Sequence, residues 1–176
     1  MAPTIQMGDY VMVEITPLVR LCDIVVYRAP APRGTAEVDY IRRIIALPGD
    51  QVAYVGGRLR LNGKIASREP VGSGDHVTIY RETLPNGCSY LIQEMDDNGI
   101  FDNTSEVTLQ PGTFYGLGDN RDDAMDSRVP TVGPIPIENI LGTAVMIYWA
   151  QDGKRIGLTL KPTKGNTMTP TSSSSP

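Results

Sequence analysis

The sequence is poor in the residues on which several common enzyme mechanisms depend. Its 176 residues include one histidine, His76, and two cysteines, Cys22 and Cys88. A Ser-His-Asp or Cys-His mechanism would have to use His76, but this residue lies in a polar loop that enters an alternating stretch, which favours a surface position. Structural zinc typically takes four Cys or His ligands at close spacing, so we expect neither a metal site nor a cofactor. The two cysteines could form a disulfide or remain free thiols, because the sequence does not give their distance.

An excess of basic charge and long apolar runs are missing as well. Lys and Arg number 16 against 20 Asp and Glu, for a net charge of −4. We therefore expect no nucleic-acid partner, because phosphate binding needs a basic face. No run approaches the about 20 apolar residues that a membrane-spanning helix needs, and no signal-peptide pattern is present at the N-terminus. Hydrophobic residues make up 40% of the chain, enough for a core, and the length favours one domain.

Alternating and β-branched stretches dominate the chain, and no stretch keeps a helical period. The 18 glycines and 14 prolines suit many turns. The sequence therefore predicts an all-β fold. The expected strand regions are 9–15, 23–30, 39–50, 51–66 (a hairpin with turns at Gly56-Gly57 and Asn62-Gly63), 76–84, 88–95, 113–120 and 140–150, with a turn-rich excursion at 31–38.

Four segments carry a family resemblance, and they occur in the family's order. MAPTIQMGD (1–9) is similar to the loop Ser-Met-x-Pro-Thr-Leu-x-x-Gly-Asp, and CDIVVYRAP (22–30) to a Gly-Asp-Ile-Val-Val-Phe strand, with Cys22 in place of glycine. DYIRRIIALPGDQV (39–52) is similar to Tyr-Ile-Lys-Arg-Val-x-Gly-Leu-Pro-Gly-Asp. GLGDNRDDAMDSR (116–128), the most specific of the four, is similar to Gly-Asp-Asn-Arg-Asp-Asn-Ser-x-Asp-Ser-Arg. Together the segments resemble the bacterial signal peptidase I family.

The resemblance implies both a fold and a location. The family fold is an antiparallel, barrel-like β structure with a small inserted β subdomain. Here the resemblance implies a peptidase core at 1–55 and 111–162, an inserted β subdomain at 56–110 and, from composition, a disordered Ser/Thr/Pro tail at 163–176. The family removes signal peptides from exported preproteins at the outer face of the bacterial membrane. Signal peptides and preproteins are therefore the implied partners, together with the membrane surface.

The family's catalytic pair is a serine and a lysine, and this chain departs from that pattern. The serine would stand directly before Met1, so we expect a truncated chain, produced either by a start codon assigned too late or by a shortened expression form. Arg42 stands at the position of the general-base lysine, and arginine stays protonated in proteins and cannot accept the serine proton. Ala124 stands where the family has a serine that bonds the lysine amine. Lys64 follows a tight turn and is expected to face solvent, so it offers no replacement.

The scaffold and the substrate-binding segments match the family better. The residues with expected scaffold roles are Arg43, Asp119, Asn120, Arg121, Ala124, Asp126 and Arg128. We expect Arg43 to pair with a carboxylate of that loop, with Asp119 the first candidate. Substrate would add as an extended strand between 6–13 and 39–42. The expected substrate-binding residues are Pro3, Thr4, Ile5, Gln6, Met7, Asp39, Tyr40 and Ile41, with Ile24, Val26 and Ile44 as further pocket residues that ordinary core packing would explain equally well.

Three functional hypotheses follow from this pattern. The first is a non-catalytic signal peptidase I family domain that recognises extended signal-peptide-like segments, for example as an assembly helper. The second is an active signal peptidase I-type serine endopeptidase, or a relative that matures conjugative-transfer proteins, in which another group activates the serine. The third, a self-cleaving repressor of related fold, is disfavoured because those proteins carry a DNA-binding domain and lack the Gly-Asp-Asn-Arg loop.

Overall fold

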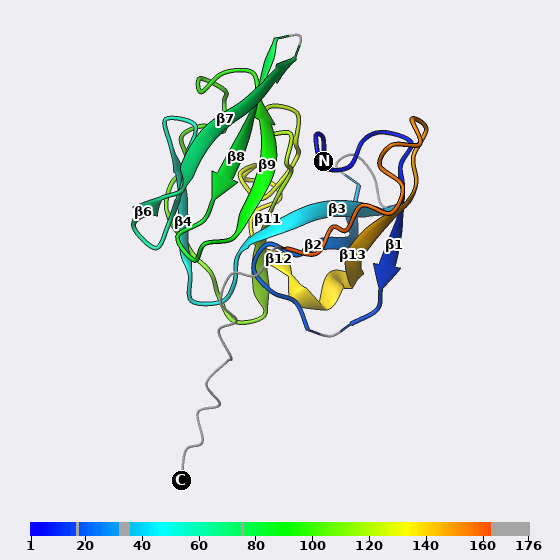
Figure 1. Ribbon diagram of the computed structural model, residues 1–176. Helices are drawn as coiled ribbons and strands as arrows, with labels where there is room; N and C mark the ends of the chain where they lie inside the picture. Colours follow the sequence, from blue (N-terminus) through cyan, green and yellow to red (C-terminus); the bar gives the residue numbers. More distant parts are fainter. Residues whose placement is uncertain (17, 32–35, 75, 163–176) are drawn as a thin grey trace.

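The structure is a computed structural model that describes residues 1–16, 18–31, 36–74 and 76–162, and its strands pair antiparallel in three sheets (Figure 1). The predicted all-β class is confirmed, since the described residues contain strands and a single 3-10 turn. In chain order the elements are β1 Tyr10–Glu14, β2 Ile24–Pro30, β3 Glu37–Ala46, β4 Gln51–Val55, β5 Arg58–Leu61, β6 Lys64–Ile65, β7 Ser67–Gly74, β8 Val77–Thr83, β9 Ser89–Glu94, β10 Val107–Thr108, β11 Thr113–Leu117, β12 Ile135–Pro136, η1 Ile137–Asn139 and β13 Ile140–Trp149.

The first sheet has six strands in the order β1-β13-β2-β3-β11-β12. Strand β3 pairs with β2 along residues 37–43, whereas β11 pairs with β3 only at residues 43, 44 and 46. Side chains alternate between the two faces of a strand. Tyr40 and Ile44 therefore belong to the apolar cluster on one face, and Ile41 belongs to the cluster on the other.

The other two sheets are built from the strands between β3 and β11. Their orders are β10-β4-β5-β6 and β7-β8-β9. Two tight turns join β4, β5 and β6 as predicted, and Asn62 and Gly63 have positive φ values of 51° and 75°, which suit a two-residue hairpin turn. In Figure 1 these strands gather on one side, and β1 and β13 lie on the other side of β3.

The sequence reasoning missed β7, the longest strand of the three-stranded sheet. SREPVGSG (67–74) contains one proline, two glycines and no alternating apolar pattern, so propensity argues against a strand. Pairing with β8 overrides this, and the register shifts between Pro70 and Gly72, where the proline cannot donate a ladder hydrogen bond. His76 and Lys64 are exposed, as expected.

The largest apolar cluster joins the inserted strands to the six-stranded sheet. Ile45 and Leu117 of that sheet pack in one cluster with Leu59 and Ile92. Strand β4, expected in the peptidase core, pairs with β5 and β10. The β4–β5 hairpin crosses the expected boundary at residue 55, and that boundary between core and subdomain stays a prediction. The expected tail, 163–176, lies outside the described residues, as do residues 32–35 of the turn expected at 31–38. The last two residues of that expected turn belong to β3.

Candidate active site

The loop after β11 is fixed to β3 and to the N-terminal segment through one buried carboxylate. Asp119 accepts Arg43 Nε at 2.9 Å on one oxygen and Arg43 Nη2 at 2.7 Å on the other. The second oxygen also accepts the Thr4 hydroxyl at 2.5 Å. Burial raises the cost of leaving either charge alone, so Arg43 and Asp119 hold each other in place. Residues 1–9, β3 and the loop at 116–128 therefore meet at one point.

A second ion pair organises the rest of the same loop. Asp126 accepts Arg128 Nε and Nη2 at 3.0 Å each, and it also accepts the backbone N–H of Gly118. Arg128 donates to the backbone carbonyl of Arg121. Because all of these groups are buried, the loop has little freedom to adopt another conformation.

Arg42 lies beside these pairs but has no carboxylate partner. Its Nη1 donates to the Ile41 carbonyl and its Nη2 to the Met125 carbonyl, both at 2.7 Å. Its Nε is buried without a hydrogen-bond partner, and its guanidinium lies 5.9 Å from the centroid of the Tyr40 ring. Among the residues that the structure describes, no Asp or Glu oxygen is within 4.0 Å of it. The side chain is therefore a cation fixed by two carbonyl oxygens.

The N-terminal segment brings Met1 close to these charges. The pKa of the Met1 α-amino group is lowered, chiefly by burial. The carboxylates of Asp119 and Asp123 oppose this shift, and the positive charge of Arg42 adds to it. Ala124 lies against Gly118, where an added Cβ would come within 2.5 Å of the alanine methyl.

A disulfide ties this site to the inserted strands. Cys22 and Cys88, whose state the sequence left open, are bonded across a sequence separation of 66 residues. The Cys22 carbonyl accepts Arg43 Nη1 at 2.9 Å. Cys22 also has a positive φ of 74°, a conformation that glycine adopts more easily. The arginine that holds Asp119 is thus bonded to the backbone at the bridge.

Comparisons with known proteins identify the family of this chain. The family model described as "Signal peptidase, peptidase S26" matches residues 1–149. The chain belongs to the signal peptidase I family. Signal peptidase I of Rickettsia typhi is 35% identical over 157 residues, covering 79% of this chain and 58% of the relative, and that of Rickettsia conorii is 34% identical with the same coverage. The chain thus spans 58% of the length of these relatives.

A solved structure of signal peptidase I from Enterococcus faecalis V583 is also similar. It superposes with a TM-score of 0.42 at 23% sequence identity, and the match covers 72% of this chain and 96% of that one.

The expected substrate-binding residues of this family member lie in two places. Pro3 and Thr4 are partly buried in the N-terminal segment, Gln6 and Met7 are exposed, and Ile5 is buried. Ile5 and Ile41 share one apolar cluster with Ile24, so the N-terminal segment and β3 are in contact through that cluster.

On β3, Asp39 forms an exposed ion pair with Arg28 at 2.7 Å, and Tyr40 stacks on Tyr27. Ile44 is fully buried in the cluster on the opposite face from Ile5 and Ile24, and Val26 is partly buried. Ile24 and Ile44 are therefore core residues in this structure.

Sequence reasoning missed a buried charge network between the inserted sheet and the site loop. Arg121 Nη2 donates to Glu82 at 2.5 Å, and the Tyr90 hydroxyl donates to the same carboxylate at 2.7 Å. Glu94 lies 2.8 Å from Arg68, and yet burial raises its pKa to about 7 because it outweighs the attraction of that arginine. The sequence contained one indication of this network. Alternate residues of a strand point to the same face, so Glu94, two residues after the buried Ile92 in β9, is directed into the interior.

Backbone hydrogen bonds at Asn120 also join β9 to the loop at 116–128. Asn120 forms a bridge with Gln93 of β9, and the Gln93 N–H donates to the Asp119 carbonyl at 2.9 Å. The inserted three-stranded sheet is thus hydrogen-bonded directly to the loop that carries Asp119.

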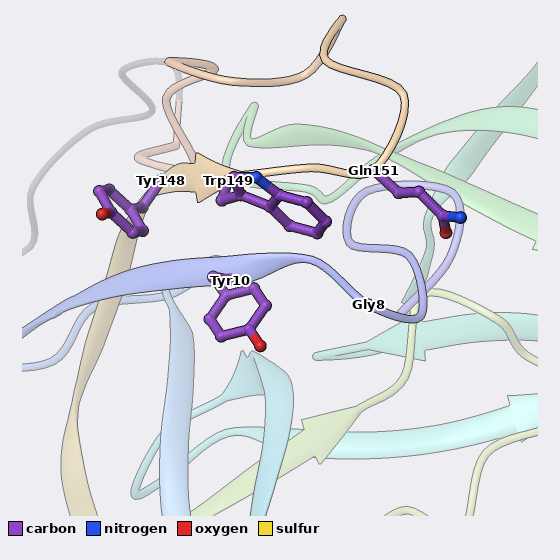
Figure 2. Close-up of a pocket in the computed structure, with 5 residues that line it drawn as sticks. All are labelled: Gly8, Tyr10, Tyr148, Trp149 and Gln151. Carbon is purple, nitrogen blue, oxygen red and sulfur yellow. The ribbon is translucent and has the colours of Figure 1, made fainter.

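An open pocket of about 510 Å³ lies at the β1 end of the six-stranded sheet, and Arg42 is not among the residues that line it. It is lined by Gly8, Tyr10, Tyr148, Trp149 and Gln151 (Figure 2). Trp149 meets Tyr10 edge-to-face with ring centroids 5.6 Å apart. Met7, next to the lining residue Gly8, is 99% exposed. The pocket is therefore part of an exposed aromatic and apolar surface.

Across the described ranges, no group of three or more His, Cys, Asp or Glu residues is arranged to hold a metal ion. The same ranges contain no helix whose length and apolar character would let it cross a bilayer.

Proposed function

We propose that this signal peptidase I family domain binds extended segments of exported preproteins and does not hydrolyse them. The observation that carries the proposal is Arg42, which stands at the family's general-base position and is hydrogen-bonded to two backbone carbonyls. A serine hydroxyl needs a neighbouring base, and an arginine side chain keeps its proton. Ala124 supplies no hydroxyl that could orient a base.

Binding is supported by the parts of the site that remain. The ion pairs Arg43–Asp119 and Arg128–Asp126 hold the loop, and Thr4 fixes the N-terminal segment to Asp119. These contacts hold the backbone of the site in place and take no part in proton transfer. The site can therefore still bind a peptide when no general base is present to activate a serine.

We place this binding at the outer face of the bacterial membrane. The buried disulfide favours an oxidising compartment, since cytosolic thiols are kept reduced. The exposed surface of Met7, Tyr10, Tyr148 and Trp149 has the composition of a membrane interface, where aromatic rings sit at headgroup level. Partition of the protein onto phospholipid vesicles, with Trp149 as the reporter, tests this part of the proposal.

The alternative is an active signal peptidase I-type serine endopeptidase in which another group activates the serine. The identity of 35% to a signal peptidase I and the intact ion pairs favour this alternative. The two functions differ in one measurement, which is cleavage of a preprotein by a chain that carries a serine directly before Met1.

The test uses that serine-bearing chain in two forms, one unchanged elsewhere and one with Arg42→Lys and Ala124→Ser. Mass spectrometry of a preprotein with a signal peptide ending in a small-x-small motif measures cleavage. We expect no product from the first form and measurable product from the second, because only lysine can be deprotonated to act as a base. Rapid cleavage by the first form would establish the alternative. Failure of the unchanged chain to bind a signal-peptide-like peptide would contradict the binding proposal.

A further inference from the structure

One edge of β3 is open beside Arg42. Residues 37–43 pair with β2 on one side, and on the other side β11 begins its pairing only at Arg43. Within the described part of the chain, residues 37–42 have no strand partner on that second side. Such an edge offers backbone donors and acceptors to an added extended strand.

Arg42 ends this open edge with a positive charge that lacks a matching anion. Two of its five N–H donors are used on the carbonyls of Ile41 and Met125, and the buried Nε has no partner. The neighbouring arginine, Arg43, by contrast, is fully neutralised by Asp119. A partly buried guanidinium without a counter-charge is stabilised by a carboxylate, which accepts its remaining donors side by side.

The surroundings of Arg42 favour a ligand that stops there. From Arg43 onward β11 occupies the edge, and the Met125 carbonyl closes the end through its bond to Arg42. The charges along the edge also have a direction, from the exposed Glu37 at its start to Arg42 at its end. The carboxylate between them, Asp39, is already paired with Arg28. A bound strand therefore runs parallel to β3 and presents its C-terminal end to Arg42.

We infer that the open edge of β3 is a binding site for an extended peptide with a free C-terminal carboxylate, and that Arg42 binds this carboxylate. A released signal peptide, which ends in a small residue with a free carboxylate, has this chemistry. The inference rests on the proposed peptide-binding function and narrows it from uncut preproteins to peptides that already end at the site. Replacement of a general-base lysine by arginine then changes a proton acceptor into a carboxylate receptor.

The experiment compares three N-terminally labelled peptides of about eight residues by fluorescence anisotropy. The first ends in Ala-x-Ala with a free carboxylate, the second is the same peptide amidated, and the third is amidated with glutamate as its last residue. We expect the peptide with the free carboxylate to bind about tenfold more tightly than the amidated peptide. A charge-assisted hydrogen bond between the carboxylate and Arg42 would strengthen binding by about this factor. We expect Arg42→Gln to abolish this preference and Arg42→Lys to retain part of it.

Arg81→Gln is the matched control, because it removes one exposed positive charge from β8 without touching β3. It should leave the tenfold preference intact. Equal binding of the first two peptides by the unchanged protein overturns the carboxylate inference and leaves the peptide-binding proposal standing. Absence of binding by all three peptides overturns both. Tight binding of the third peptide supports the carboxylate site and identifies an acidic side chain as a second source of the carboxylate.

Discussion

The Cys22–Cys88 disulfide allows a prediction whose size follows from the chain length that it encloses. The bond joins residues 66 positions apart, and both cysteines are buried. Closing a loop of this length removes conformational entropy from the unfolded chain, which corresponds to about 4 kcal/mol at 25 °C in the chain-entropy treatment. We expect reduction, or the double change Cys22→Ala with Cys88→Ala, to lower the free energy of unfolding by about that amount.

Urea unfolding, followed by the fluorescence of Trp149, measures the effect. The oxidised protein should unfold at a higher urea concentration than the reduced protein, and its melting temperature should be roughly 10 °C higher. The dependence of the free energy of unfolding on urea should also be steeper without the bond, because the unlinked unfolded chain exposes more surface. The double variant is the control, since a reducing agent should not change its unfolding.

A second pair of variants separates the bond from the backbone conformation at its end. Cys22 has a φ of 74°, which costs a residue with a Cβ roughly 1 kcal/mol more than glycine. Cys22→Gly with Cys88→Ala should therefore be more stable than Cys22→Ala with Cys88→Ala by about that amount, although neither contains the bond. Identical urea midpoints for the oxidised and reduced proteins would refute the reasoning about the loop, and identical midpoints for the two variants would refute the reasoning about the backbone.

Two further predictions concern the inserted sheet and the aromatic surface. Burial raises the pKa of Glu94 to about 7 from its ordinary value of 4.5, so the folded protein holds a proton there that the unfolded chain has released. Stability should therefore fall as the pH rises from about 4.5 to 7 and then level off. In urea unfolding at several pH values, Glu94→Gln should flatten that fall. On phospholipid vesicles, Trp149 emission should shift to shorter wavelength, and Met7→Ser with Tyr10→Ser should weaken the partition about tenfold through lost apolar burial.

Each of these two predictions has an outcome that contradicts it. An unchanged pH profile in Glu94→Gln would mean that a different group produces the fall in stability. Trp149 emission that stays the same at saturating lipid would show that the aromatic surface does not enter the headgroup region.

The sequence determined the family and the strand content, because both depend on local patterns. Alternation and turn residues located most of the strands, including the hairpin turns at Gly56-Gly57 and Asn62-Gly63. Strand β7 was not predictable, since its residues disfavour a strand and only pairing with β8 creates one. The order of the strands in the sheets is likewise a property of long-range pairing, and no short motif encodes it.

The chemistry of the site divides in the same way. The resemblance to the family's motifs predicts from the sequence alone that Arg42 stands at the general-base position and Ala124 at the serine position, and both assignments stay predictions. The Arg43–Asp119 pair was expected from the sequence and is present, whereas only the tertiary structure showed that Thr4 also bonds Asp119 and that the two cysteines bond to each other. These partners lie 66 to 115 residues apart in the chain. Their contacts exist because sheet pairing carries distant segments to one place, and residue types alone do not contain that information.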